Sequence, residues 1–517
     1  MVDPVRDNVP APVSIKRNIA ANYVGQGVAS LLSLALVPVY IRYLGIEAYS
    51  LVGLFAVIQA WMALLDAGMA PTLGREMARF TAGTVTVQAI RDLLRSIETL
   101  YLGMAALVAL SLTWAADFLA RHWLNIDRLP VEVVIGALSM LGVVVALRFC
   151  EGIYRSALMG LQQQVWINTM MVIVAVSRSL GALGVLAMVS PTVQAFFAWQ
   201  GLISVLSLGA MMVRLHRSLP RAPRPARFSL ASLATVRRFA GGVFGITILS
   251  MMLMQIDKLL LSRLIGLTDF GYYMLAATIA GGLWLVGAPV VLAVAPVLVR
   301  LTEAGDETQL SVTYHKASQL VAVLLAPASL IMMVFPFGVL FAWSGDAALA
   351  ARAAAILAMI SAGIFMNGLW QVPMQLQLAA GWTGLTLRIQ LVALVVMVVG
   401  LFWAVPIWGP IAAAALWTLI NSFFLIIGMP LVHRRLLPGA LRRWWLRDVL
   451  PPLVGAVVAV ALAWLVRPAP DAGRWLWLGF IMLTGSVAIA ASLAMADTLR
   501  GRVLEIAGAT TARFRGG

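Results

Sequence analysis

The sequence predicts an all-α polytopic membrane protein with about 14 transmembrane helices, arranged as two six-helix lobes related by an internal repeat plus a C-terminal helix pair. Hydrophobic residues make up 62% of the 517 residues and charged residues only 11%, with a mean hydropathy of +0.95. This composition is typical of a chain dissolved in a bilayer and excludes a soluble domain that merely has a large core. Besides composition, two observations predict this fold: the apolar spans and the repeat.

Each apolar span is close to the roughly 20 residues that cross a bilayer as a helix. In the first half the predicted spans are Ile19–Ile41, Ala48–Ala70, Thr99–Leu119, Val131–Gly152, Trp166–Val189 and Val193–Val213. In the second half they are Gly241–Ser262, Tyr272–Leu298, Ala317–Trp343, Ala348–Met374, Leu385–Val405 and Pro410–His433, followed by Leu450–Val466 and Trp475–Ala496. Prolines interrupt several of these spans, and we expect bends there because proline lacks a backbone donor: Pro38, Pro289, Pro327, Pro336 and Pro373.

The repeat consists of two similar motifs separated by more than 200 residues. Arg42–Gly45 leads through an apolar span to Ala70–Arg75, and Arg263–Gly266 leads through another to Ala295–Arg300. The two Arg-to-Arg spacings differ by four residues, about one helical turn. Both copies can therefore run the same helix pair across a membrane, and a chain built from two related membrane halves is a transporter candidate.

The positions of lysine and arginine predict the orientation, because cytoplasmic loops retain these residues. With both termini in the cytoplasm, inner segments hold 27 of the 37 lysines and arginines. The net charge of +16 is therefore interpreted as a topology signal that also attracts anionic lipid headgroups, and no nucleic-acid partner is expected. The predicted domains are an N-terminal lobe (1–213), a basic, proline-containing cytoplasmic linker (214–239), a C-terminal lobe (240–433) and an extra helix pair with a cytoplasmic tail (434–517).

The sequence contains no motif typical of an enzyme active site. A glycine-rich phosphate loop, a nucleophile constellation and paired catalytic carboxylates are absent, and the four histidines lack metal-ligand spacing, so neither a cofactor nor a metal is expected. The single cysteine, Cys150, lies in an apolar span and has no partner for an internal disulfide.

Several residues carry a family resemblance. They are Asn22, Tyr43–Gly45, Tyr49, Leu65–Met69 and Arg75, with Asp257–Lys258 opening the second copy. With these residues the chain resembles the polysaccharide-transporter branch (Wzx-type O-antigen flippases) of the multidrug/oligosaccharidyl-lipid/polysaccharide (MOP) exporter superfamily.

The resemblance implies a flippase in the bacterial inner membrane. Its substrate would be an undecaprenyl-diphosphate-linked oligosaccharide, moved from the cytoplasmic to the outer leaflet by alternating access of the two lobes, for O-antigen, capsule or exopolysaccharide. The resemblance also suggests the polysaccharide polymerase and chain-length machinery as partners, with the flippase itself a monomer.

Cationic residues within the spans are the first candidates for binding the substrate, since guanidinium groups pair well with phosphate oxygens. Arg178 lies near the predicted midplane, whereas Arg42, Lys258 and Arg263 lie toward the outer ends of their helices. Arg42 and Arg263 fit equally a role as residues that reach the outer headgroups. Arg148 lies nearer the inner end of its span. Glu151 is interpreted as structural, because Arg148 lies three residues away on the same helix face.

Neutral polar residues are the second class of candidates, because sugar hydroxyls need donors and acceptors. A stripe of polar residues at every fourth position of the first span includes Asn22 and Gln26. Further cavity candidates within spans are Gln59, Asn367, Gln371 and Asn421. For all of these, hydrogen bonding between helices is the alternative interpretation.

Two acidic residues, Asp66 and Asp257, are candidates for gating or for coupling to an ion. Asp257 adjoins Lys258, but neighbours in a helix point about 100° apart, so we expect that they need not pair. Two other functions stay open: a MATE-like drug or cation exporter, which would rely on cavity acids, and an integral membrane enzyme acting on lipid-linked sugars, which the short outer loops disfavour.

Overall fold

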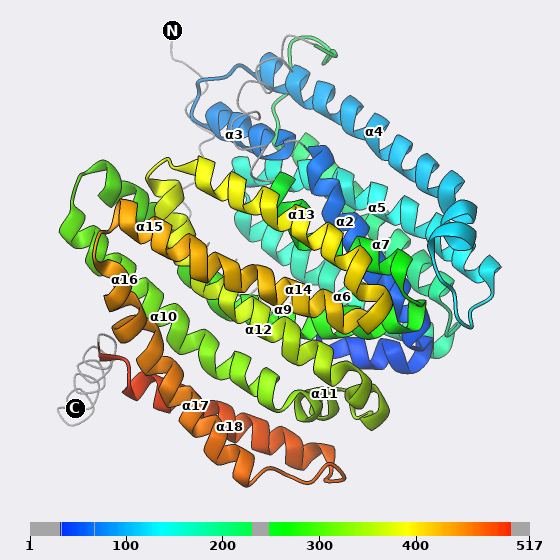
Figure 1. The fold of residues 1–517 in the computed structure, drawn as a ribbon. Helices are drawn as coiled ribbons and strands as arrows, with labels where there is room; N and C mark the ends of the chain where they lie inside the picture. Colours follow the sequence, from blue (N-terminus) through cyan, green and yellow to red (C-terminus); the bar gives the residue numbers. More distant parts are fainter. Residues whose placement is uncertain (1–31, 33, 67, 230–247, 498–517) are drawn as a thin grey trace, which may run out of the picture. The chain divides into compact units, whose positions relative to one another are not determined.

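The structure, a computed structural model, describes residues 32, 34–66, 68–229 and 248–497, and in these ranges it is helical throughout apart from short connections (Figure 1). Twelve of the described helices are long and apolar enough to cross a membrane. The predicted all-helical membrane fold is thus confirmed. The count of about 14 stays a prediction, because the predicted spans Ile19–Ile41 and Gly241–Ser262 fall partly outside the described residues.

The described residues group into two units. The N-terminal unit runs to Met251 and includes Gly266–Gly271, whereas the C-terminal unit comprises Met252–Ile265 and the residues from Tyr272 onward. The predicted lobe and linker boundaries stay predictions.

The first helix among the described residues of the N-terminal unit is a short apolar one, Leu34–Leu44. It is followed by α2 (Ile46–Asp66), α3 (Met69–Thr81), α4 (Val87–Phe118) with the π-helical turn η2 (Leu119–Trp123), α5 (Val131–Gly160), α6 (Gln164–Met188) and α7 (Val193–Ser218). The helix α5 is the centre of this unit, since α2, α3, α4, α6 and α7 all contact it. Thr86 and Thr192 cap α4 and α7 by accepting a hydrogen bond from a backbone N–H of the first turn.

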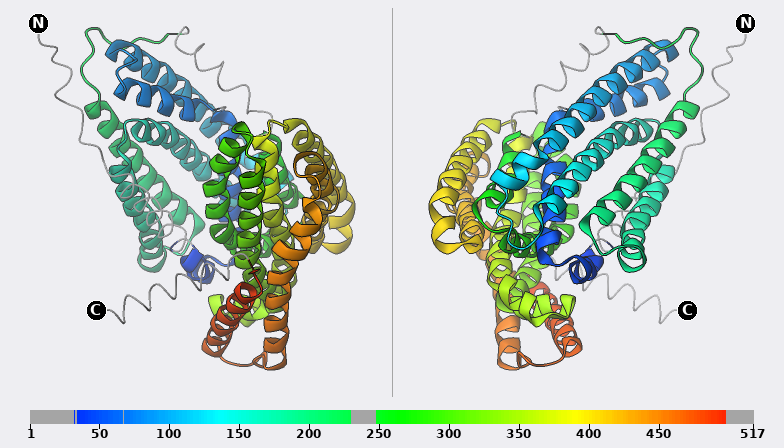
Figure 2. Two further views of the ribbon diagram at one scale, coloured as in Figure 1. Left: turned by 90° about the vertical axis from the view of Figure 1, so that its left-hand side faces the viewer. Right: turned by 90° about the vertical axis from the view of Figure 1, so that its right-hand side faces the viewer.

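The C-terminal unit contains a helix over residues 248–264, of which the first part groups with the other unit, and most of α9 (Leu267–Glu303). It continues with α10 (Glu307–Val334), α11 (Pro336–Ser344), α12 (Ala347–Ala379), α13 (Thr383–Trp408), α14 (Pro410–Phe423), η3 (Phe424–Gly428), α15 (Met429–Leu436), α16 (Ala440–Arg443), η4 (Trp444–Val449), α17 (Leu450–Leu465) and α18 (Arg474–Ala494). Helices α17 and α18 run side by side as a hairpin, shown in orange and red in Figure 2, and both contact α10.

The two copies of the repeat fold differently. In the first copy, Gly68 adopts the left-handed conformation (φ 78°), which ends α2 and starts α3 in a new direction. In the second copy the corresponding stretch belongs to one continuous helix of 37 residues, α9, which contains Pro289 and Pro296.

The predicted prolines also differ in their effect on the helices. Pro327 and Pro373 lie inside α10 and α12. Pro336 instead occupies the first turn of α11, so the predicted span Ala317–Trp343 is two helices rather than one bent helix. A proline is tolerated in the first turn because the N–H it lacks has no partner there.

Candidate functional site

The N-terminal unit contains an open cavity of about 360 Å³ beside its central helix. This volume is in the range of small-molecule sites, roughly 300–1,000 Å³. The cavity is lined from α2 by Gln59, Met62, Ala63 and Asp66, from α3 by Ala70 and Pro71, from α4 by Tyr101, and from α5 by Arg148, Phe149, Gly152, Arg155, Ser156 and Met159. Two arginines and one aspartate make its wall cationic on balance.

Arg148 is held in this wall by neutral groups. Its Nη1 donates to Gln59 Oε1 at 2.9 Å, and its Nη2 donates to Gln200 Oε1 at 2.6 Å. The guanidinium carbon lies 4.7 Å from the centre of the Phe55 ring, a cation–π contact. These partners orient the guanidinium without cancelling its charge. Its Nε is buried and has no hydrogen-bond partner among the described residues.

Arg178, the predicted midplane residue, makes an ion pair within the N-terminal unit. It lies on α6, where its Nη2 donates to Glu151 Oε1 at 2.7 Å and to Ser204 Oγ at 3.1 Å. The two charged side chains are only 19% and 13% exposed. Arg178 is not among the residues that line the cavity described above. The structure therefore pairs Arg178 with Glu151 and leaves Arg148 to face the cavity.

Sequence reasoning did not select Arg148 as a site residue. The spacing of three indicated Arg148 as the companion of a structural Glu151, but Glu151 makes its ion pair with Arg178 on another helix. The signal that could have found Arg148 is its charge alone, since an arginine inside a span is costly and usually faces water or a partner.

Asp66 lines the cavity at the break between α2 and α3. Its Oδ1 accepts a hydrogen bond from the Ala70 backbone N–H at 2.9 Å and another from the Tyr101 hydroxyl. Arg75 does not reach it and instead lies 3.8 Å from Glu76. Asp66 is thus fixed at the cavity by neutral donors.

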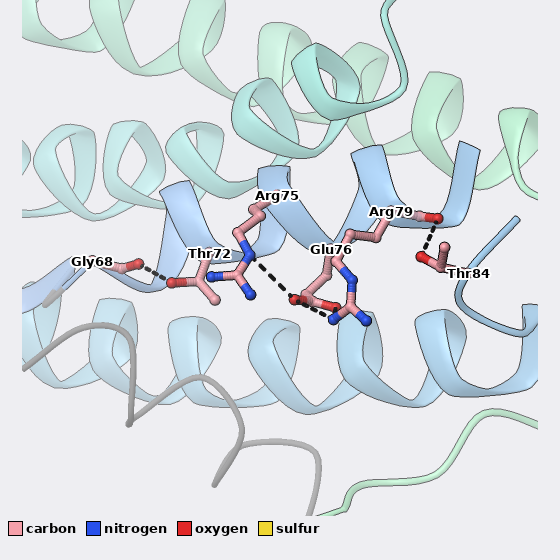
Figure 3. Close-up of polar contacts among 6 residues, drawn as sticks. All are labelled: Gly68, Thr72, Arg75, Glu76, Arg79 and Thr84. Atoms are coloured by element: carbon pink, nitrogen blue, oxygen red, sulfur yellow. Dashed lines mark hydrogen bonds and ion pairs between the residues drawn. The ribbon is translucent and has the colours of Figure 1, made fainter. Parts of the chain in front are cut away.

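Helix α3 follows this break and carries its own polar network (Figure 3). Thr72 Oγ1 donates to the Gly68 carbonyl at 2.7 Å, and the Glu76 carboxylate lies between the guanidinium groups of Arg75 and Arg79. The opposite side of α3 packs against α5, where Ser156 Oγ donates to the Ala70 carbonyl at 2.6 Å. The packing fixes the cavity wall that α3 contributes.

A second cavity, of about 240 Å³, lies within the C-terminal unit and contains Asp257 and Lys258. Contrary to the expectation that these neighbours need not pair, Lys258 Nζ lies 3.2 Å from Asp257 Oδ1. The same ammonium donates to the Met254 carbonyl at 2.8 Å, and the Tyr273 hydroxyl donates to Asp257 Oδ2 at 2.5 Å. Asp257 is buried, whereas a fifth of the Lys258 side chain is exposed.

The three amide candidates of the second half form a chain of hydrogen bonds. Gln371 Nε2 donates to Asn367 Oδ1 at 2.8 Å, and Asn367 Nδ2 donates to Asn421 Oδ1 at 2.6 Å. Asn421 Nδ2 in turn donates to the Trp417 carbonyl at 2.7 Å. These bonds join α12 to α14, and Gln371 also lines a small void of about 10 Å³.

The remaining candidates lie apart from both cavities or outside the described residues. Arg42 and Arg263 are exposed near the turns that end their helices. Asn22 and Gln26 lie outside the described residues. Of the predicted site residues, the structure therefore brings Gln59 and Asp66 together at the first cavity and Asp257 and Lys258 together at the second.

Comparison with known protein families gives a match over residues 15–302, more than half of the chain, to the family described as "Polysaccharide biosynthesis protein". The chain belongs to this family. A comparison with curated proteins gives no match.

Solved structures share the fold of this family member at low sequence identity. The structure titled "Lipid II flippase MurJ, inward closed conformation" matches with a TM-score of 0.65 and 10% identity, covering 95% of this chain and 100% of that one. An inward-facing multidrug resistance MATE family transporter matches with a TM-score of 0.63 and 14% identity, covering 82% and 99%. A MOP superfamily transporter from Pyrococcus furiosus matches with a TM-score of 0.56 and 16% identity, covering 83% and 96%.

Family and fold together place the chain in the MOP exporter superfamily as a multi-pass membrane protein. The predicted superfamily is confirmed. At these identities the structures establish the fold, and the substrate has to be argued from the chain's own residues.

Proposed function

We propose that this protein is a flippase that moves an undecaprenyl-diphosphate-linked oligosaccharide from the cytoplasmic to the outer leaflet of the bacterial inner membrane. The glycan would enter a surface polysaccharide such as O-antigen, capsule or exopolysaccharide. Membership of a polysaccharide biosynthesis family supports this role, as does a fold shared with a lipid II flippase.

The observation that carries the proposal is the position of Arg148 in the cavity of the N-terminal unit. A diphosphate cannot enter hydrocarbon without compensation for its lost hydration, so a protein that moves it must offer a polar cavity with positive charge. Arg148 offers a fixed guanidinium whose hydrogen-bond partners, Gln59 and Gln200, are neutral. An anion entering the cavity therefore meets a guanidinium that is hydrogen-bonded to two amides and makes no direct ion pair with a carboxylate.

Arg155 supplies a second positive charge to the same wall and is exposed. It lies seven residues after Arg148 on α5, about two helical turns further along the same side. The predicted topology places Arg155 at the cytoplasmic end of its span, the side on which the lipid-linked saccharide is assembled. Arg155 thus suits the first contact with the diphosphate and Arg148 the deeper one.

A drug or cation exporter of the same fold is the competing function. Such a protein needs an available cavity carboxylate, and Asp66 does line the first cavity. However, Asp66 already accepts hydrogen bonds from Tyr101 and Ala70, and two arginines share its cavity. The balance of charge favours an anionic substrate over a cation.

Gene deletion with complementation tests the proposal. We expect deletion to accumulate lipid-linked saccharide in the inner leaflet, measured as protection from a membrane-impermeant oxidant in sealed spheroplasts. Wild-type protein should restore outer-leaflet exposure, and Arg148→Ala should lower it by roughly 10- to 100-fold, as expected for the loss of a hydrogen-bonding charged group worth about 1.5–3 kcal/mol.

Arg121→Ala is the matched control, because Arg121 is an exposed arginine outside the cavity that pairs with Asp117. It should restore transport fully. If deletion leaves the lipid-linked pool and the surface glycan unchanged but sensitises cells to drugs, the flippase assignment is wrong and the exporter is favoured. Full activity of Arg148→Ala at wild-type protein levels would remove the arginine from the mechanism.

A further inference from the structure

The second cavity, in the C-terminal unit, is lined by groups to which the proposed diphosphate contacts at Arg148 and Arg155 assign no role. One wall carries Asp257, Lys258 and Gln255 from the helix over residues 248–264. The other walls carry the aromatic side chains Tyr273 and Trp284 from α9 and Trp417 from α14. A pocket with polar groups on one wall and aromatic rings on the others has the composition of a binding site, and its volume of about 240 Å³ suits a small ligand.

The charges of the polar wall cancel each other. Lys258 Nζ lies 3.2 Å from Asp257 Oδ1, and Tyr273 donates to the other carboxylate oxygen at 2.5 Å. A diphosphate would meet the buried Asp257 carboxylate, and an organic cation would meet the Lys258 ammonium. Neither ion is favoured here.

Hydrogen-bonding capacity remains after these contacts. An ammonium group has three donors, and that of Lys258 gives one to the Met254 carbonyl and one to Asp257. A carboxylate accepts at about four lone-pair positions, of which Tyr273 occupies one and Lys258, which contacts both oxygens, occupies two. A neutral molecule with several hydroxyl groups can use the remaining donor and acceptor.

The aromatic walls complement the other side of such a molecule. A sugar ring presents hydroxyls at its rim and C–H groups on its faces, and large aromatic side chains pack on apolar faces while keeping polar edges available. Gly281 lies one turn before Trp284 on α9, and a Cβ added to it would meet no atom within 4 Å. The space beside Gly281 is therefore open.

We propose that this cavity binds a neutral sugar unit of the transported glycan, as a saccharide subsite within the C-terminal unit. The inference rests on the proposed function for the identity of the ligand, since the sugar is part of the lipid-linked oligosaccharide. Binding itself is measured with free glycan, so the two proposals fail separately.

The test uses purified full-length protein in lipid nanodiscs and saturation-transfer difference NMR. The probe is a set of oligosaccharides released by partial acid hydrolysis of the host's own surface polysaccharide, which can be prepared whether or not the protein is a flippase. We expect the wild type to bind them with sugar-ring C–H protons receiving the strongest saturation. Trp284→Ala should weaken binding about tenfold or more, as for other buried aromatic anchors, whereas Trp403→Ala, at an exposed tryptophan of α13, should leave it unchanged.

A second pair of variants protects the test from misfolding of the tryptophan variant. Gly281→Leu places a side chain in the open space of the cavity and should abolish glycan binding. Gly282→Leu is the matched control, because the neighbouring glycine is equally uncrowded but is not part of the cavity lining. Both variants should elute as monodisperse protein.

The outcomes separate the two proposals. Absence of glycan binding to wild-type protein that does flip lipid-linked saccharide would overturn the subsite alone, as would unchanged binding in Gly281→Leu. Binding of tetraphenylphosphonium that Asp257→Asn removes, without glycan binding, would make the cavity a cation site. Glycan binding in a protein whose deletion causes no glycan defect would support the subsite and overturn the flippase.

Discussion

Glu151 on α5 is paired with Arg178 on α6 and not with Arg148, which lies one turn away on its own helix. Arg178 thus makes a direct ion pair, whereas the direct hydrogen-bond partners of Arg148 are the neutral side chains of Gln59 and Gln200. We predict that the two carry different roles, with Arg178 stabilising the N-terminal unit and Arg148 serving the substrate.

Glu151→Gln should therefore destabilise the protein. Removing the carboxylate leaves the largely buried Arg178 charge without its ion-pair partner, and the loss of a hydrogen bond to a charged group is worth about 1.5–3 kcal/mol. The measurement is thermal unfolding in detergent. Ser204→Ala, which removes only the longer 3.1 Å contact to Arg178, should shift the unfolding temperature less. Equal shifts in both variants would show that the ion pair contributes nothing of its own.

Gln59→Glu should inhibit transport without unfolding the protein. Gln59 Oε1 accepts from Arg148 at 2.9 Å, and glutamate has the same shape but adds a negative charge. The resulting ion pair would cancel the cationic wall, so initial flipping rates should fall about tenfold or more. Gln309→Glu, at an exposed position of α10, is the control and should transport normally. Normal flipping by Gln59→Glu would mean that the charge of Arg148 is not used.

The pair of His315 on α10 and Asp448 in η4 should hold the C-terminal helix pair in place. Their side chains are 3% and 2% exposed and are hydrogen-bonded to each other, and Gln319 Nε2 on α10 also donates to the Arg447 carbonyl at 2.9 Å. His315→Ala would leave Asp448 buried without this partner, a change that costs about 3–5 kcal/mol in comparable sites.

We expect His315→Ala to expose the α17–α18 hairpin to limited proteolysis at its connections before the rest of the chain. Glu307→Gln, at the exposed start of α10, should leave the digestion pattern unchanged. Wild-type resistance of His315→Ala would show that apolar packing alone is enough to hold the hairpin.

Gly160→Ala should weaken the packing of α3 on α5. A Cβ at Gly160 would collide with the Gly74 carbonyl oxygen and lie 2.8 Å from Met77 Cβ. Overpacking of this kind costs about 1–3 kcal/mol, so the unfolding temperature should fall. Gly136→Ala on the same helix meets its nearest atom at 3.8 Å and should be neutral or stabilising. Since α3 forms part of the first cavity, flipping should decline together with stability.

The fold was predictable from the sequence because a membrane helix is encoded locally, by about 20 apolar residues in a row. The positions at which helices end within or next to a span were harder to predict. Pro336 was expected to bend a span, but it begins a new helix, α11. The second span was predicted to end at Ala70, close to Gly68, but the helix α3 that follows was not predicted. A proline or glycine signals a break only when the packing around it accepts one, and that packing is not local.

The site was less predictable for a related reason. Spacing along one helix predicts neighbours on that helix, so it indicated Arg148 as the companion of Glu151. The actual companion, Arg178, lies 27 residues away and reaches Glu151 only through the packing of α6 against α5. Likewise, nothing in the sequence distinguishes Trp284 and Trp417 from other aromatic residues in the apolar spans, but in the structure both line one cavity.

Cys150, the only cysteine of the chain, is buried in α5, with its thiol directed at the Tyr101 carbonyl at 3.9 Å. A maleimide in the surrounding water has no access to a thiol in this position. The unmodified protein should therefore give almost no maleimide labelling. A single cysteine introduced at either cavity would then report how accessible that cavity is during transport, and Cys150 would not have to be replaced first.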